Sequence, residues 1–526
     1  MTEAVRQEPH FNLWDEPWIT LELPAGGTEL LGIADTLLRA SDFTGIYDPS
    51  PLVIASIHRL LTAILQGICN PQRPPDLRRL RADRRFPIDK IQAFGAQYSD
   101  RFDIFSQPMP FLQSVDLPLQ PAKADAPRLK SVSQLTVETS RSTALDHYRH
   151  GRIFDEQFCP ACTARGLVTI PSFTSSGGRG LKPSINGVPP IYVLPGGVSL
   201  FESLAASVLL PDYLPAARST SGDMPWWSRP PIVQTQEVYE VGYLQSLTFP
   251  ARRVRLHPQL LTGICTRCGE AATWGVRTMI FEMGESRSKE TAFWQDPFVA
   301  YRQGEKGPVP IRPQEGKALW REFAGLFLVY PKNTKSDVTL RPRVLDQVAD
   351  LEAETGNEVT NRQFRCIGLR TDNKAKVFEW LDAGFDVPMA ILQDEDASLH
   401  IRYALEFASE CDRELANAFR KHFGGKSQKG ERHRRLKEQM RADFWSTLAA
   451  PFREFVLALG QVLITERLPQ SSAWADTVVA TGRAAFRQAS EAVGDDAASL
   501  RQRVQGQERC NYALNIKRKK FWVAKE

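Results

Sequence analysis

The sequence predicts an α+β protein in which a large mixed N-terminal domain (1–385) with a four-cysteine zinc-binding element precedes a C-terminal four-helix bundle (386–526). Three observations support this prediction. Short runs typical of strands lie before residue 385, long amphipathic segments follow it, and two C-x-x-C pairs stand far apart in the first part.

Composition limits the class of protein. The chain has 526 residues, of which 42% are hydrophobic and 10% aromatic, which is typical of a folded protein with two or three domains. We find no apolar run of about 18 residues, and the N-terminal stretch MTEAVRQEPHFNLWDEPW is polar and contains acids. We therefore expect a cytoplasmic protein with no signal peptide and no membrane partner.

The N-terminal domain begins with recognisable elements. Residues 17–33 alternate apolar and polar side chains around an Ala-Gly-Gly turn, which predicts a hairpin, and residues 51–68 have the apolar spacing of a helix. Between about 100 and 380 the chain is rich in Pro and Gly. There we expect a strand at 252–258 and a helix at 317–331.

The C-terminal part has apolar residues at spacings of three and four. The predicted helices cover 387–423, 436–460, 477–493 and 499–522. Four amphipathic helices with loops between them are typical of an up-down bundle.

Four of the eight cysteines form the pairs CPAC (159–162) and CTRC (265–268). A disulfide framework is not expected in a large chain without a secretion signal, and a thioredoxin-like site needs only one pair in a βαβ unit. Four thiolates suit tetrahedral zinc and leave no open position for catalysis. We predict that Cys159, Cys162, Cys265 and Cys268 hold one structural Zn2+ that joins two distant segments; two unrelated pairs, or other chemistry, are the alternatives.

A glycine-rich basic loop, SSGGRGLKPSINGV (175–188), follows the first pair. It is not a P-loop, because Leu181 follows Gly180 and Pro183 follows Lys182. Its glycines allow the backbone to approach a ligand closely, and its cations suit a nucleic acid. The candidate contacts are Gly177, Gly178, Gly180 and Lys182; an ordinary surface turn between strands is the alternative.

Basic residues are clustered although the net charge is only +5, from 66 Lys and Arg against 61 Asp and Glu. The runs are 76–85, 420–441 and 516–520. Together they favour a polyanionic partner, whereas any one run alone fits a solvated helix face. In the second run we expect an electrostatic track for DNA made by Lys426, Lys429, Arg432, Arg434 and Arg435.

No catalytic constellation is apparent. The sequence has no H-E-x-x-H, no G-x-S-x-G and no G-x-G-x-x-G after a strand. The acidic stretches 346–354 and 393–398 are more typical of surface or helix N-terminal charge. We therefore expect a binding protein rather than an enzyme. One alternative is a zinc-stapled nucleic-acid-processing enzyme with an unrecognised active site, using carboxylates such as Asp394 or Asp396; another is an assembly protein that never touches DNA.

A family resemblance runs along nearly the whole chain. The stretch FNLWDEPWITL, with Asn12, Leu13, Trp18 and Ile19, resembles the opening of the CasA family, the large subunit of the type I-E CRISPR Cascade complex. The likeness continues through PSPLVIASIHRLLTAILQ, FDIFSQPMPFLQ, CPAC with its glycine loop, FPARRVRL before CTRCGE, GLRTDNKAKVFEW (368–380) and the terminal helices. The order and spacing of these segments carry the resemblance.

The resemblance implies a non-catalytic subunit that recognises the protospacer-adjacent motif (PAM) in double-stranded target DNA, helps to open the duplex for guide RNA bound with other Cascade subunits, and helps to recruit a helicase-nuclease. In that family a glycine loop, a lysine and a hairpin wedge approach the motif from the minor groove. The hairpin tip matches Asn373, Lys374 and Ala375, with Lys374 where the family has glutamine. Arg277 and Lys289 are the candidates for the separate lysine.

General physical chemistry is consistent with such a reader. The minor groove presents a degenerate pattern, so a reader there tolerates several motifs. Asn373 is expected to hydrogen-bond groove acceptors, while Lys374 and Lys376 neutralise phosphates or separate the first base pair.

Overall fold

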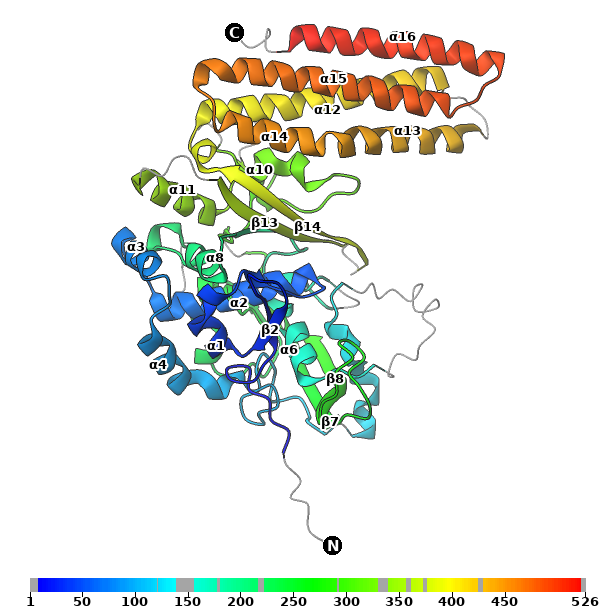
Figure 1. Ribbon diagram of the computed structural model, residues 1–526. Coiled ribbons are helices and arrows are strands. Elements are labelled where there is room, and N and C mark those ends of the chain that lie inside the picture. Colours follow the sequence, from blue (N-terminus) through cyan, green and yellow to red (C-terminus); the bar gives the residue numbers. More distant parts are fainter. Residues whose placement is uncertain are drawn as a thin grey trace. The chain divides into compact units, whose positions relative to one another are not determined.

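The structure, a computed structural model, describes residues 8–120, 122–138, 156–176, 180–215, 222–290, 293–329, 339–355, 361–371, 376–423 and 429–521. The chain forms two compact units with a mixture of helices and strands (Figure 1). Unit 1 comprises 1–313, 342–351 and 363–385; unit 2 comprises 314–341, 352–362 and 386–526. Two segments that precede residue 385 thus belong to unit 2, and the division into domains at that residue stays a prediction.

The predicted N-terminal hairpin is confirmed. β1 (Ile19–Glu22) pairs antiparallel with β2 (Thr28–Leu31), and β3 (Gly45–Ile46) pairs with the other edge of β1. Gly26 and Gly27 form the turn with φ of +89° and +86°, a region that glycine enters without steric cost.

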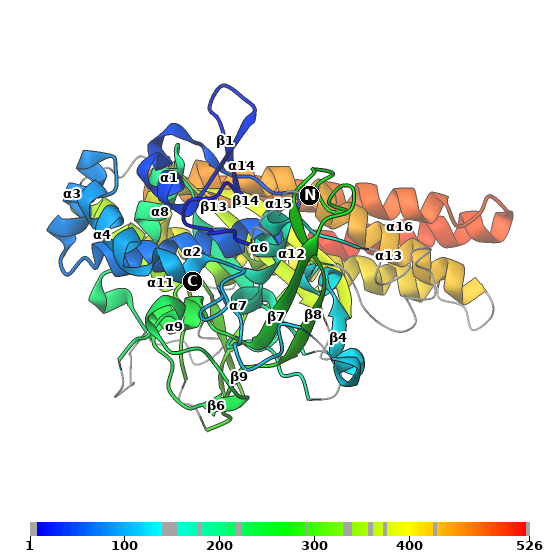
Figure 2. The same cartoon turned by 90° about the horizontal axis from the view of Figure 1, so that it is seen from below.

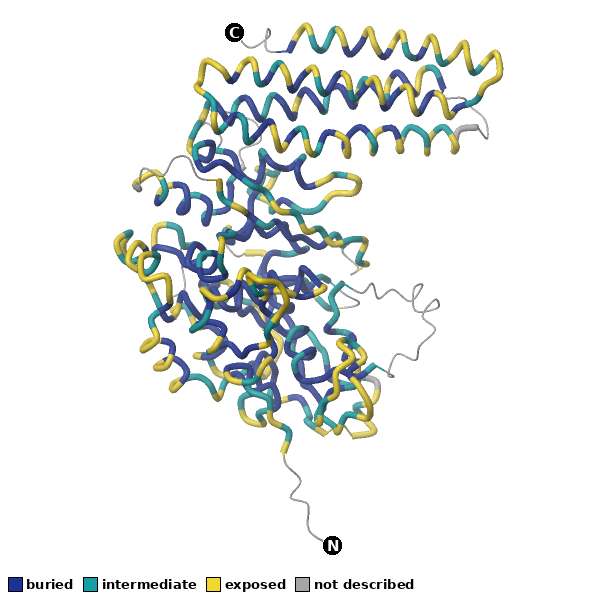
Figure 3. Tube along the Cα trace, viewed as in Figure 1, coloured by how far each residue is buried: buried dark blue, intermediate teal, exposed yellow. Residues whose placement is uncertain are grey.

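Helix α2 (Pro51–Cys69) lies in the core of unit 1, and nearly all of its residues are buried (Figure 3). It begins with a proline in its first turn and ends at Asn70, whose left-handed backbone (φ 36°) stops the helix. By length and composition alone α2 could cross a membrane, so the expectation that no apolar run of that length exists is wrong here. In the fold it is a mostly buried core helix that contacts α4 (Ile88–Tyr98), α8 (Leu200–Ser207) and α9 (Tyr243–Leu247).

Helices α1 (Ile33–Leu38) and α3 (Pro74–Asp83) complete this side of unit 1. They contact α4 and α8, respectively.

A long antiparallel ribbon carries the second cysteine pair. β7 (Arg252–Leu260) and β8 (Trp274–Met283) lie side by side (Figure 2), and β4 (Leu129–Ser131) pairs with the other edge of β8. The register shifts between His257 and Pro258, because proline has no N–H to donate to the ladder. The strand predicted at 252–258 is confirmed and is slightly longer.

A second sheet has the order β14-β13-β5. β5 (Ile191–Pro195) is fully buried and pairs antiparallel with β13 (Asn361–Thr371), whereas β14 (Val377–Pro388) is an edge strand with alternating exposure. β13 and β14 flank residues 372–375, where the hairpin tip was predicted. Smaller pairs are β6 (Gln236–Val238) with β9 (Glu285–Arg287), and β10 (Tyr301–Gly304) with β11 (Gly307–Pro310).

Unit 2 contains the predicted C-terminal helices. They are α12 (Glu395–Phe423), α13 (Lys429–Thr447), α14 (Ala449–Leu459), α15 (Arg467–Glu491) and α16 (Ala497–Lys520). α12 packs against α13, α15 and α16, and α15 also packs against α13, α14 and α16.

The boundaries in unit 2 differ from those predicted. The segment 436–460 is divided between α13 and α14, and the helix predicted at 317–331 is reduced to a 3-10 turn (Leu319–Glu322) and the short α10 (Phe323–Phe327). Trp320 and Phe323 both pack on Phe452 of α14. Their ring centroids lie 4.9 and 5.6 Å, respectively, from the centroid of Phe452.

Candidate metal centre and nucleic-acid interface

The four predicted cysteine ligands form one cluster. All four Sγ atoms lie within 4.8 Å of one another, and those of Cys159 and Cys268 are 3.8 Å apart. Four thiolates about 2.3 Å from one ion at a tetrahedron's centre are about 3.8 Å from each other. The donor set and its spacing therefore fit one tetrahedral metal ion.

Backbone geometry prepares the cluster. Cys159 caps α6 (Pro160–Leu167), where its Sγ accepts a hydrogen bond from the Cys162 N–H at 3.4 Å, and its own N–H donates to Cys265 Sγ at 3.2 Å. After the second pair, Gly269 turns the chain with φ of +81°, and its N–H donates to the Cys265 carbonyl at 2.9 Å. Each C-x-x-C unit is thus a local turn, and the cluster joins the start of α6 to the end of the β7–β8 ribbon.

The electrostatics of the cluster also favour a cation. Hydrogen bonding with Cys159 and Cys162 lowers the pKa of the Cys265 thiol. Hydrogen bonding with Cys159 and Cys265, together with burial, raises the pKa of Cys162. Cys265 is therefore favoured as the thiolate, whereas Cys162 is favoured as the neutral thiol unless a metal ion offsets the negative charge of a second thiolate.

The glycine loop follows α6 and α7 (Ile170–Phe173), so it does not connect two strands as the alternative interpretation required. Gly180 has φ of +87°, and a Cβ built there meets no atom within 4 Å. Its backbone is therefore open to an approaching ligand. Gly177 and Gly178 lie outside the described residues.

Arg252 of β7 holds this loop on both sides of its glycines. Its Nη2 donates to the Ser175 carbonyl at 2.8 Å and its Nη1 to the Lys182 carbonyl at 2.7 Å. The side chain is buried, and burial lowers its pKa to about 10. No carboxylate within the described part of the chain forms an ion pair with it, so its charge is directed at the loop backbone. Sequence analysis missed this residue; the signal was an arginine on the inward-facing side of a strand.

The two candidates for the separate lysine lie in different environments. Lys289 lines the same pocket as Lys182, beside the glycine loop. Arg277 instead donates to Gln157 Oε1 at 2.8 Å and to Thr262 Oγ1 at 2.6 Å, close to the cysteine cluster. Lys182 forms an ion pair with Glu237 and donates to Ser286 Oγ at 3.4 Å, so its charge is partly balanced.

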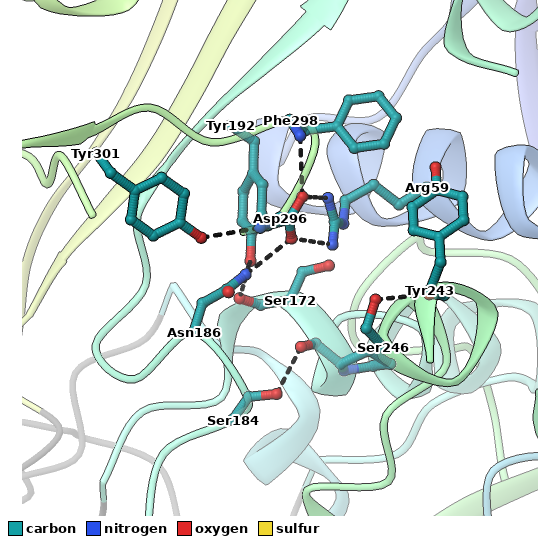
Figure 4. A network of polar contacts seen from close by, with 11 residues as sticks. Arg59, Ser172, Ser184, Asn186, Tyr192, Tyr243, Ser246, Asp296, Phe298 and Tyr301 are labelled. Atoms are coloured by element: carbon teal, nitrogen blue, oxygen red, sulfur yellow. Dashed lines mark hydrogen bonds and ion pairs between the residues drawn. The ribbon is translucent and has the colours of Figure 1, made fainter. Parts of the chain in front are cut away.

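A buried polar network includes Asn186 of the loop (Figure 4). Asp296 accepts two hydrogen bonds from Arg59 of α2, at 3.1 and 2.7 Å, and one from the Asn186 side-chain amide at 2.9 Å. The guanidinium of Arg59 also lies 4.4 Å from the centre of the Tyr192 ring. The network therefore connects the C-terminal end of the glycine loop to the central helix.

The hairpin stem combines aromatic and basic side chains. The cationic groups of Arg370 and Lys376 lie over the ring of Phe378, 4.5 and 5.1 Å from its centre. Arg370 also forms an ion pair with Glu379 at 2.8 Å. Trp380 on the same strand is about half exposed. The predicted tip residues Asn373, Lys374 and Ala375 lie outside the described residues.

The predicted electrostatic track lies on α13. Arg432, Arg434 and Arg435 are exposed, and two of them form i,i+4 ion pairs, Arg434 with Glu438 (3.3 Å) and Arg435 with Glu431 (2.7 Å). These pairs are solvated and weak, so both arginines remain available to phosphates. Lys426 lies outside the described residues, and only the backbone of Lys429 is described.

The carboxylates of the enzyme alternative have structural partners. Arg467 pairs with Asp394 at 2.5 Å and with Asp396 at 2.8 Å, and Asp394 also accepts the Ala397 N–H at 2.9 Å in the first turn of α12.

Comparison with known proteins identifies the family. Residues 12–485 match the family model of CRISPR-associated protein Cse1. The chain is 29% identical over 421 residues to the CRISPR-associated protein CasA/Cse1 of Thermus thermophilus, covering 77% of this chain and 76% of the relative.

Solved structures share the fold. A structure of Thermus thermophilus CasA (Cse1) superposes with a TM-score of 0.76 at 24% identity, covering 96% of this chain and 99% of that one. A chain of a CRISPR RNA-guided surveillance complex gives a TM-score of 0.71 at 18% identity, covering 96% and 100%. Because the family model spans most of the sequence, this chain belongs to the CRISPR-associated protein Cse1 family.

Proposed function

We propose that this chain is the non-catalytic large subunit of a cytoplasmic type I-E CRISPR surveillance complex, in which it recognises the PAM in double-stranded DNA. It helps to open the duplex for pairing with the guide RNA that the other subunits hold, and it helps to recruit the helicase-nuclease. The observation that carries the proposal is the glycine loop, which is open at Gly180 and held by Arg252 on both sides of its glycines. Family membership and the surveillance-complex chain of similar fold support it.

The loop suits a minor groove. A backbone without a Cβ approaches the floor of a narrow groove more closely than a side chain allows, and its N–H groups meet the acceptors that every base pair presents there. Lys289 takes the role of the separate lysine, because it lines the pocket beside the loop whereas Arg277 is bound near the cysteines.

The hairpin acts as the wedge in this proposal. Asn373, Lys374 and Ala375 form its tip and enter the duplex beside the motif, with Lys374 contributing a positive charge. The stem beneath is stiffened by the stacking of Arg370 and Lys376 on Phe378.

The metal ion in the cysteine cluster is structural zinc in this proposal. Four thiolate ligands leave no open coordination position, so the ion contributes stability rather than chemistry. The C-terminal helices form a four-helix bundle in which α13 and α14, taken together, count as one of the four helices. The exposed arginines of α13 guide DNA along this bundle.

The experiment compares binding of the assembled guide-RNA complex to matched duplexes that carry a library of candidate motifs. The hairpin variant is Asn373→Ala combined with Lys374→Ala, and the loop variant is Gly180→Ala. Both are expected to lose motif-dependent binding while still binding single-stranded target DNA.

The control for the loop is Gly222→Ala, another glycine with positive φ (+81°) and no atom within 4 Å of its added Cβ. It carries the same backbone strain at a different place and is expected to retain motif dependence. If neither the hairpin nor the loop variant changes the motif dependence, the proposal is wrong.

A further inference from the structure

We propose that a cationic pocket beside the glycine loop binds one unpaired nucleotide of a nucleic-acid strand, with its phosphate on the cations and its base against Phe293. The pocket has a volume of about 610 Å³, which lies within the range of small-molecule sites. The inference rests on the proposed function only in requiring a nucleic-acid strand to pass the loop.

The charge of the pocket is the first argument. Its lining includes five cationic side chains, those of Lys182, Arg287, Lys289, Lys306 and Arg312. Glu237 is the only carboxylate among the described lining residues and is paired with Lys182. Besides Lys182 and Arg287, the cations of Lys289, Lys306 and Arg312 line the pocket and attract a phosphate.

The placement of these cations strengthens the attraction. Burial lowers the pKa of both Arg287 and Arg312, so water solvates these guanidinium groups incompletely. Arg312 is oriented by a hydrogen bond from its Nε to the Val188 carbonyl at 3.0 Å. A phosphate gains more from a fixed, partly desolvated guanidinium than from a freely solvated one.

An aromatic rim supplies the second argument. Phe293 lines the pocket and is 47% exposed. Its ring meets Tyr301 edge-on, with centroids 5.2 Å apart and an interplanar angle of 90°. This contact fixes an exposed ring in place, and a fixed exposed ring beside cations is the arrangement on which unpaired bases stack.

Two residues of the pocket wall are held in place by buried hydrogen bonds. Asn186 and Tyr301 both line the pocket and both belong to the buried network of Figure 4: Asn186 donates to Asp296 at 2.9 Å, and the Tyr301 hydroxyl accepts the Asp296 N–H at 2.9 Å. Because these wall residues are fixed before a ligand arrives, less conformational entropy is lost when the ligand binds.

The experiment is isothermal titration calorimetry of the purified full-length chain with four probes at low ionic strength. The probes are uridine 5′-monophosphate, 2′-deoxyuridine 5′-monophosphate, uridine and inorganic phosphate. We expect each nucleotide to bind at least about fivefold more tightly than uridine or phosphate, since only the nucleotides engage both ring and cations. Equal binding of phosphate and nucleotide would identify a simple anion site and overturn the proposal, as would no binding of any probe.

Variants at two positions locate the site. Phe293→Ala is expected to weaken nucleotide binding at least about fivefold while Phe293→Tyr keeps it, and Lys306→Gln is expected to weaken the nucleotides but not uridine. The matched controls are Tyr47→Ala, which removes a ring that is 45% exposed elsewhere, and Lys130→Gln on β4; both are expected to bind like wild type. Nucleotide binding that is unchanged in Phe293→Ala and Lys306→Gln overturns the proposal.

The assembled complex then identifies the strand. Single 5-iodouracil substitutions in the target strand, the displaced strand or the guide RNA, followed by irradiation, are expected to cross-link the peptide that contains Phe293 from one strand only. If the mononucleotides bind but no strand cross-links, the pocket does not serve a nucleic-acid strand and the proposal fails. This result leaves the motif-reading test with Gly180→Ala unaffected, so the two failures are distinguishable.

Discussion

Arg59 and Asp296 form a fully buried, two-point ion pair, although they lie on segments far apart in the chain. The Asp296 carboxylate also accepts the Asn186 amide, so the pair stabilises both the central helix and the wall of the cationic pocket. Removing one partner of such a pair leaves an uncompensated buried charge.

Asp296→Asn is therefore expected to lower the free energy of unfolding by about 3–5 kcal/mol, measured by chemical denaturation. The control is Asp382→Asn, which breaks the more exposed pair between Asp382 and Arg365 (2.7 Å) and is expected to cost no more than about 1 kcal/mol. Equal losses in the two variants would contradict the role assigned to the buried pair.

Arg252→Met is expected to abolish motif-dependent duplex binding while leaving the affinity for single-stranded target unchanged, because the chain on the two sides of the loop glycines loses its common anchor. The control is Arg255→Met on the same strand, since Arg255 donates to the Gln107 carbonyl and not to the loop. Filter binding of the assembled complex measures both. Retention of motif dependence in Arg252→Met would show that the loop does not need this anchor.

One zinc ion per chain is expected in the purified protein, measured by mass spectrometry of the metal content. Cys265→Ser is expected to lose it and to make residues 156–176 and 252–283 more sensitive to proteolysis, because the ion joins these segments. Cys69→Ser, at a cysteine outside the cluster, is expected to retain the metal. A metal content that is unaffected by Cys265→Ser would exclude this site.

Acid is expected to destabilise the protein through His58. Burial, with the nearby guanidinium groups of Arg59 and Arg365, lowers the pKa of His58 to about 3, against 6.5 as its ordinary value. The unfolded chain therefore takes up this proton first as the pH falls. The stability that neutral His58 contributes is complete above about pH 6.5 and is lost toward pH 3, at up to about 1.4 kcal/mol per pH unit.

Denaturation curves measured from pH 7.5 to 5 test this slope. His58→Gln keeps a polar group near Ser207 Oγ, which lies 2.8 Å from His58 Nε2, and is expected to remove this part of the slope. An unchanged slope would assign the acid sensitivity to other groups.

Replacing Arg432, Arg434 and Arg435 of α13 together by Gln is expected to weaken duplex binding and to reduce the slope of log affinity against log salt by roughly two to three, without altering motif preference. The control replaces the exposed Arg78, Arg79 and Arg85 by Gln, which changes the net charge equally. An equal reduction in both variants would indicate a general charge effect rather than a track on α13.

Local patterns explain what the sequence could predict. The first hairpin and α2 each depend on residues within one short window, and the structure confirms both. Each C-x-x-C pair is also a local pattern, and the structure brings the two pairs together. Two boundary errors also have local causes. Pro451 has no N–H for a bond to the Thr447 carbonyl, so α13 and α14 separate. The helix predicted from residue 387 begins only at Glu395, because Asp394 caps α12 by accepting the Ala397 N–H.

The rest depends on long-range contacts. Arg252 contacts the glycine loop, and Asp296 pairs with Arg59, across segments that only folding brings together. The cations of the pocket likewise come from segments that are separate in the sequence. In the sequence each looks like an ordinary polar residue on a strand or loop. Their burial, and the absence of a carboxylate beside Arg252 among the described residues, could be recognised only in three dimensions.

The distance along the chain between Arg59 and Asp296 also affects biosynthesis. The two residues are 237 positions apart, so α2 leaves the ribosome well before its partner is translated. At about 5–20 residues per second this delay lasts roughly 10–50 s. Throughout that time the nascent chain carries a helix apolar enough for a membrane and an arginine without its counter-ion. Co-translational protection of this segment by chaperones is therefore expected to determine how much of the protein reaches its native state.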